Sequence, residues 1–153
     1  MSRTERTQRG FSLIELLIVV AIIGILVSII VPAYRSSIRR GNEAAAIGTL
    51  RTIRDSQIDY AMSHRGEYGT FDQLIQAKYL DQRFAGDQPV ISGYIFRLKV
   101  TPKSGTQPAF FSVNADPQQP GVTGTRYFYI DSNVSVPREN SEQPASPDDP
   151  PIE

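Results

Sequence analysis

One segment of the chain is almost wholly apolar. Residues 16–31 carry no charge, and thirteen of these sixteen residues are Leu, Ile or Val, interrupted by Ala21, Gly24 and Ser28. Each branched aliphatic contributes about −0.3 to −0.6 kcal/mol to membrane insertion, so thirteen of them outweigh one acidic residue near the membrane edge. Residues 11–33 together number 23, enough to cross a bilayer at about 1.5 Å per residue. We therefore predict a membrane-spanning helix over residues 11–33.

Beyond this segment the pattern becomes amphipathic. Apolar side chains recur at roughly helical spacing among charged ones. We expect Ile47, Leu50, Ile58 and Ala61 to form a stripe that packs on the core, with Ile53 and Met62 beside it. One helix from Phe11 to about Ser63 would hold 53 residues and span about 80 Å. Because that is too long for a compact domain, we expect its first half to protrude and its second half to form the spine of a head.

The rest of the pattern predicts an α+β head over residues 34–136. Residues 70–80 indicate a short helix that opens at a cap, Thr70. Residues 93–101 alternate apolar and polar side chains, which is typical of a strand with one wet face. Further strands are expected at residues 109–115, 125–131 and 134–136. An antiparallel sheet packed on the second half of the long helix would bury the aromatic side chains of these strands.

The last segment, residues 137–153, has a different composition. It holds five prolines and five acidic residues in seventeen, so we predict a disordered or extended tail without a packed core. The tail has two interpretations, an acidic surface that improves solubility or a docking peptide for a partner.

Charge and targeting signals predict where the chain resides. Arg3, Arg6 and Arg9 precede the apolar segment, and basic residues stay in the cytoplasm, so the head is expected outside the inner membrane. No small-x-small site for an ordinary signal peptidase follows the segment. The chain has no cysteine, so no disulfide can hold the head. After residue 10 the chain carries 13 basic and 15 acidic residues, which indicates no nucleic-acid partner.

The residues that usually carry enzyme chemistry are scarce. His64 is the one histidine and is expected to be a solvated residue near the negative end of a helix dipole. With one histidine, the sequence offers few ways to form a Ser-His-Asp triad. It contains no glycine-rich phosphate-binding loop. The carboxylates lack the spacing of a calcium loop; carboxylates brought together only by folding are the alternative. We expect no catalytic site, no metal and no cofactor.

Residues 10–34, GFSLIELLIVVAIIGILVSIIVPAY, resemble the N-terminal signature of type IV prepilins and of the pseudopilins of type II secretion systems. The shared features are Gly10, Phe11, Glu15, the uncharged run and Pro32, whereas Ser12 stands where the usual form has Thr. The resemblance implies that a prepilin peptidase cuts between Gly10 and Phe11 and methylates the new amine of Phe11. Residues 1–10 are then a leader, and residues 11–33 are retained as the membrane-spanning and filament-core half of the helix.

Glu15 is the one charge at the start of the apolar run, and cleavage would supply its partner. A Phe11 ammonium group would lie one helical turn away, and the positive end of the helix dipole also favours a carboxylate there. The resemblance implies instead a pair between Glu15 and the Phe11 amine of a neighbouring subunit. The sequence leaves both pairings open.

Gly24 and Pro32 are expected to influence the shape of the helix. Pro32 offers no amide hydrogen to the carbonyl of Ser28, so the helix should kink or loosen there. The resemblance implies that the helix can unwind between Gly24 and Pro32; a simple kink in a continuous helix is the alternative.

The function implied by the resemblance is structural. The chain is expected to be a pilin that polymerises with other copies and other pilins, with a prepilin peptidase and an assembly platform in the inner membrane as partners. A type II secretion pseudopilin is one alternative, and a signal-anchored periplasmic binding module is another. The sequence does not separate a major from a minor subunit, or adhesion, motility, DNA uptake and secretion from one another.

Overall fold

The computed structural model describes residues 10–152. The predicted leader, residues 1–10, therefore lies outside the described residues except for Gly10. Within the described part the chain forms a long helix, a short helix, a 3₁₀ turn and a sheet of five strands. The elements are α1 (Leu13–Ser63), α2 (Phe71–Gln76), η1 (Gln82–Phe84), β1 (Val90–Ile91), β2 (Tyr94–Thr101), β3 (Phe110–Pro117), β4 (Tyr127–Asp131) and β5 (Arg138–Asn140).

The chain divides into two compact units, Met1–Ser36 and Ser37–Glu153. The boundary lies within α1, three residues after the position predicted from the end of the apolar segment. The described part of the first unit is helical from Leu13 onward. We call the second unit the head.

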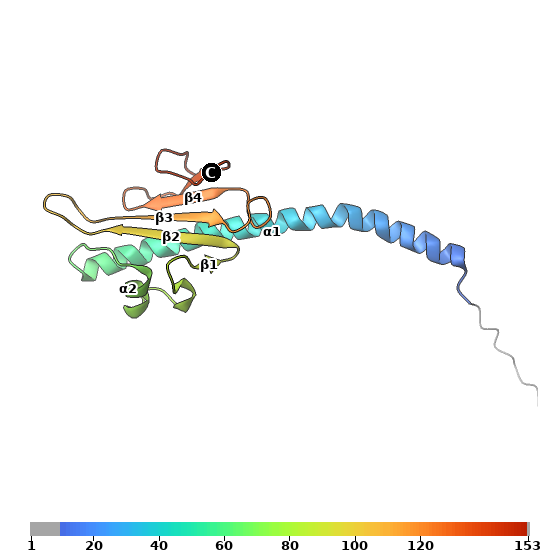
Figure 1. The fold of residues 1–153 in the computed structure, drawn as a ribbon, viewed down its shortest axis with the longest axis horizontal. Helices are drawn as coiled ribbons and strands as arrows, with labels where there is room; N and C mark the ends of the chain where they lie inside the picture. Colours follow the sequence, from blue (N-terminus) through green and yellow to red (C-terminus); the bar gives the residue numbers. More distant parts are fainter. Residues whose placement is uncertain (1–9, 153) are drawn as a thin grey trace, which may run out of the picture. The chain divides into compact units, whose positions relative to one another are not determined.

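The head contains an antiparallel sheet in the simple order β1-β2-β3-β4-β5. Figure 1 shows this sheet lying across the second half of α1, with α2 beside it. Side chains on the helix-facing side align across neighbouring strands: Ala115 of β3 lies opposite Phe96 of β2 and Phe128 of β4. All three are fully buried, so the sheet and the second half of α1 enclose one hydrophobic core. The predicted α+β class is confirmed.

The core-facing side of α1 differs in part from the predicted stripe. The buried seam follows spacings of three and four residues: Glu43, Ala46, Leu50, Ile53, Gln57 and Tyr60. Of the predicted stripe, Leu50 is buried, whereas Ile47, Ile58 and Ala61 are only partly buried. Of the two residues placed beside it, Ile53 is buried and Met62 is 80% exposed. The prediction erred because it followed hydrophobicity alone, whereas the seam includes two polar positions whose partners come from distant loops.

The short helix α2 is shorter than predicted. Thr70 does act as its cap, because the Thr70 hydroxyl accepts from the Gln73 amide and the Gln73 side chain accepts from the Thr70 amide. The helix ends at Gln76 because Lys78 adopts a left-handed conformation with φ of 64°, which turns the chain away from the helix axis.

The C-terminal part of the chain differs most from the prediction. β5 is Arg138–Asn140 and pairs with β4, so the strand predicted at residues 134–136 is wrong. The tail was predicted to be disordered or extended without packing, but among its described residues Ala145 is buried and its carbonyl accepts a hydrogen bond of 2.8 Å from Asn114 Nδ2. The tail folds back as far as Pro151, which bridges to Arg138. Amino-acid composition alone gives no information about these contacts with the sheet.

Candidate functional site

The sequence-predicted site lies at the beginning of α1. Phe11 is 77% exposed and precedes the helix, and Glu15 is the acidic residue of its first turn. The Leu16 amide donates to the Ser12 carbonyl at 3.1 Å, which forms the first helical turn around Glu15. A carboxylate in this turn is stabilised by the unpaired amides of the helix N-terminus.

The Phe11–Glu15 pair requires a free amine. In the intact chain the Phe11 nitrogen belongs to a peptide bond with Gly10 and carries no charge. Within residues 10–152, Glu15 makes no ion pair and no side-chain hydrogen bond. Its carboxylate is exposed and available to a partner from outside the described structure. Both pairings of Glu15 therefore stay predictions.

The apolar part of α1 is uncovered on all sides. Every Leu, Ile and Val from Leu13 to Val31 is at least 41% exposed. A helix that is apolar all round belongs in a membrane or among other helices. It is also the one helix of the described chain that is long and apolar enough to cross a membrane, and none of its most apolar 18-residue window is buried.

Helical backbone runs through both residues that were expected to shape the apolar segment. Pro32 lies inside α1, and a Cβ added at Gly24 would meet open space. The Ser28 hydroxyl turns back and donates to the Ile25 carbonyl at 2.7 Å. The secondary structure of the monomer thus agrees with a continuous helix, and the kink and the unwinding stay predictions.

A polar clamp that the sequence pattern did not predict joins the head part of α1 to the loop that follows β3. Arg39 Nη1 donates to the Gly121 carbonyl at 2.9 Å, and Asn42 Nδ2 donates to the Thr123 carbonyl at 2.8 Å. These two side chains lie one turn apart on α1, so they hold the loop at neighbouring points of the helix.

Glu43 forms the buried centre of this clamp. Its Oε1 accepts from the amide and the hydroxyl of Thr125, both at 2.8 Å, and its Oε2 accepts from Arg126 Nε at 2.9 Å. Arg126 Nη1 also donates to Glu139 of β5 at 2.5 Å. Burial alone would raise the pKa of Glu43, but the bonds from Thr125 and Arg126 outweigh burial and hold this pKa below its usual 4.5. The sequence held one signal for this clamp: Glu43 lies three residues before the buried Ala46, on the same core-facing side of α1.

Three of the scattered carboxylates have structural partners within the head. Asp81 pairs with Arg83, Asp116 pairs with Arg97, and Asp131 accepts from the amides of its own turn. No group of three or more His, Cys, Asp or Glu side chains that could hold a metal ion occurs among residues 10–152.

His64 is exposed, as predicted. Its ring stacks on Tyr60 with 3.7 Å between the ring centroids and covers that buried side chain.

Comparison with known proteins finds a match for the N-terminal segment. The family model described as the prokaryotic N-terminal methylation motif matches residues 6–31. Residues 6–31 therefore resemble that motif, and they include Gly10, Phe11 and Glu15. No solved structure is significantly similar to the chain.

The curated relatives include fimbrial proteins, a major pilin and a core protein of a type II secretion system. The chain is 40% identical over 81 residues to a type IV major fimbrial protein, FimA, of Dichelobacter nodosus, covering 52% of this chain and 41% of the relative. It is 32% identical over 73 residues to type II secretion system core protein G of Dickeya chrysanthemi, covering 48% and 47%. It is 39% identical over 57 residues to the type IV major pilin protein PilE1 of Neisseria gonorrhoeae, covering 37% and 34%. The matched segments thus span less than half of each relative.

Proposed function

We propose that the chain is a structural subunit of a type IV pilus-like filament that polymerises through its N-terminal helix. The observation that carries the proposal is the uncovered apolar helix with a single carboxylate in its first turn, inside the matched methylation motif. Such a helix is stable in a bilayer and equally stable among identical helices at the centre of a fibre. The proposed role is one of assembly, without catalysis, cofactor or nucleic acid.

Processing would create the charge that Glu15 needs. A prepilin peptidase would remove residues 1–10 by cutting between Gly10 and Phe11 and would methylate the new amine of Phe11. Opposite unit charges about 4 Å apart at an effective dielectric of 20 attract by about 4 kcal/mol, which desolvation partly offsets. A pair between Glu15 and the Phe11 amine of a neighbouring subunit would favour one axial register in the filament.

The subunit would then pass from membrane to filament. Arg3, Arg6 and Arg9 would keep the N-terminus in the cytoplasm, with the head outside the inner membrane. An assembly platform in that membrane would add subunits, and head-to-tail contacts that do not close into a ring would generate a fibre of this chain and other pilins.

A pseudopilin of a type II secretion system is the second candidate. The 32% identity to core protein G of such a system supports it, and that match covers a share of this chain similar to that of the fimbrial protein. A pseudopilin would use the same cleavage and the same helix, so the location of the processed subunit distinguishes the two candidates.

The test is mass spectrometry of two fractions from native cells, fibres sheared from the surface and the remaining membranes. The informative tryptic peptide runs from Phe11 to Arg35 and should carry one added methyl group. Its abundance in sheared fibres would support a surface pilin, and its confinement to membranes would support a pseudopilin.

A Gly10→Glu variant is the control, because it alters the residue before the proposed cut and leaves the retained helix intact. It should keep residues 1–10 and yield no methylated peptide. A wild-type chain that still carries its N-terminal residues in every fraction would contradict the proposal and leave a signal-anchored binding module.

A further inference from the structure

A stretch of basic residues follows the apolar segment directly. Arg35, Arg39 and Arg40 are its charges, and no acidic residue lies between Glu15 and Glu43. Clusters of arginine next to a membrane helix attract anionic lipids, because each positive charge near an anionic surface gains favourable electrostatic energy. These arginines lie on the head side of the apolar segment, which is expected outside the cytoplasm. The preference of basic residues for the cytoplasmic side therefore does not explain them.

Arg35 and Arg40 are free of partners within the described structure. Both are exposed, and neither forms an ion pair or a side-chain hydrogen bond with residues 10–152. Arg39 differs, because it is only partly exposed and donates to the Gly121 carbonyl. Two of the three guanidinium groups can therefore contact an outside partner without disturbing the head.

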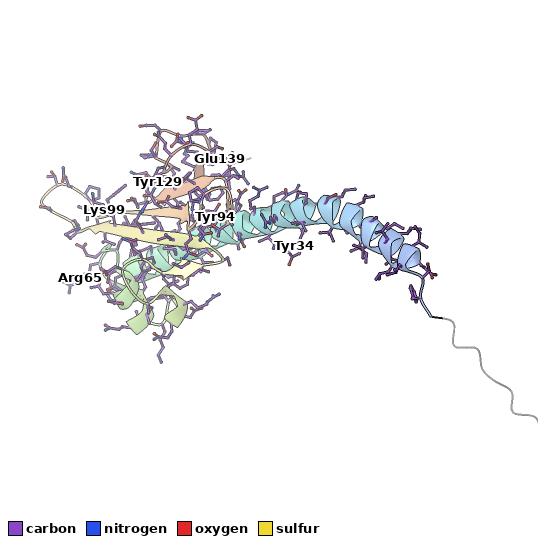
Figure 2. The ribbon with its side chains drawn as sticks, turned by 45° about the vertical axis from the view of Figure 1, so that its right-hand side comes forward. Tyr34, Arg65, Tyr94, Lys99, Tyr129 and Glu139 are labelled. Carbon is purple, nitrogen blue, oxygen red and sulfur yellow. The ribbon has the colours of Figure 1, made fainter. Side chains whose placement is uncertain are left out.

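The spacing along α1 suits the headgroup layer of a bilayer. At about 1.5 Å per residue, Arg35 and Arg40 lie roughly 3 Å and 10 Å along the helix from Ala33, the last residue of the apolar segment. The headgroup layer is about 5 to 8 Å thick, and a long arginine side chain can reach back toward it. Tyr34 is 65% exposed and stands out from α1 (Figure 2), as tyrosines at membrane interfaces do.

We propose that Arg35 and Arg40 each bind the phosphate group of an anionic phospholipid, such as phosphatidylglycerol, while the subunit is stored in the membrane. The inference rests on the proposed function only in that the apolar segment enters a bilayer. A second copy of the chain is the competing partner. Lipid is favoured because the arginines adjoin the segment that a membrane would cover, whereas Glu43, the nearest acid after them, is buried and already bound to Thr125 and Arg126.

The test is native mass spectrometry of the full chain in non-ionic detergent, titrated with phosphatidylglycerol or phosphatidylethanolamine. Two double variants remove the same charge, R35Q with R40Q at the membrane edge and R51Q with R65Q at exposed positions in the head. Each arginine near an anionic surface provides roughly a fivefold preference. The first double variant should therefore reduce the preference for phosphatidylglycerol about 25-fold, whereas the second should keep it.

Three results would overturn the lipid proposal. The wild type could bind both lipids equally, both double variants could lose the preference equally, or R35Q with R40Q could abolish dimers while lipid binding stays unchanged. The last result would favour the second copy. These results are independent of the test for the processed peptide that begins at Phe11. A lipid preference without processing would refute the filament role alone. Processing without a lipid preference would refute the lipid inference alone.

Discussion

Gln57 binds both backbone groups of Gly69. Its Nε2 donates to the Gly69 carbonyl at 2.6 Å and its Oε1 accepts from the Gly69 amide at 2.9 Å, with both residues buried. One side chain of α1 thereby satisfies the donor and the acceptor of a residue twelve positions later, in the loop that leads to α2. The bonds fix where this loop crosses the core, because a buried backbone group without a partner is costly.

Gln57→Leu should lower the free energy of unfolding by about 2 to 4 kcal/mol, because it leaves both groups of Gly69 buried and unpaired. Urea unfolding of the full chain in non-ionic detergent, followed by near-ultraviolet circular dichroism of the tyrosines, measures the change. Gln76→Leu makes the same substitution at an exposed position and should leave the midpoint within error. Equal midpoints for both variants would mean that the Gly69 bonds contribute little to stability.

Glu43 should make the stability of the head depend on acid pH. Its folded-state pKa lies below its ordinary value of 4.5, so its contribution is present above that value and is lost as the pH falls through the folded-state pKa. Glu43→Gln should lower stability by about 2 kcal/mol at pH 7 and flatten the pH profile below pH 5. Urea midpoints from pH 3 to pH 7 test this, with the exposed Glu142→Gln as control. Parallel profiles for wild type and Glu43→Gln would contradict the assignment.

Arg126 joins α1 to β5, since its guanidinium contacts both Glu43 and Glu139. Arg126→Gln should cost about 3 kcal/mol, because it leaves the Glu43 carboxylate buried without a countercharge. Arg126→Lys should not recover the lost stability. A single ammonium group cannot contact both carboxylates as the planar guanidinium group does.

The control for Arg126 is Arg83→Gln, which breaks the exposed pair with Asp81 and should leave the urea midpoint nearly unchanged. A lysine variant as stable as the wild type would show that charge alone, without the fork, holds the two elements.

Asp149 should hold the tail in its folded-back path. It accepts from the amide and hydroxyl of Ser146 and from Asn140 Nδ2, and these bonds lower its pKa. Asp149→Ala should accelerate hydrogen exchange of the amides in residues 138–152, measured by mass spectrometry at neutral pH. Asp148→Ala changes the exposed neighbour and should leave the exchange unaltered. Equally fast exchange in the wild type would mean that the tail does not rest on the sheet in solution.

Glu15→Ala should spare membrane insertion and impair assembly, because the apolar run is untouched while the countercharge for the Phe11 amine is lost. We expect at least a tenfold reduction of subunit in sheared fibres, with unchanged resistance to carbonate extraction from membranes. Ser12→Ala serves as a control for substitution in the same region. Normal fibres from the Glu15 variant would refute the pairing.

Features that depend on neighbours along the chain could be predicted from the order of residues alone. The apolar run, the cap at Thr70 and the alternation of β2 are local patterns, so the long helix and the strand at residues 94–101 were predicted close to their observed bounds, and the short helix was predicted correctly at its start. The candidate site at Phe11 and Glu15, which stays a prediction, rests on the same kind of local signal, a lone carboxylate beside a long uncharged run.

The polar residues that the core contains and the packing of the C-terminal segment depend on contacts between residues far apart in the chain. Glu43 faces the core because Thr125 and Arg126, more than eighty residues later, supply its bonds. The tail lies on the sheet because Asn114 binds the carbonyl of Ala145. Such partners meet only after the sheet has formed, and their bonds offset the cost of burying polar groups that hydrophobicity alone assigns to solvent.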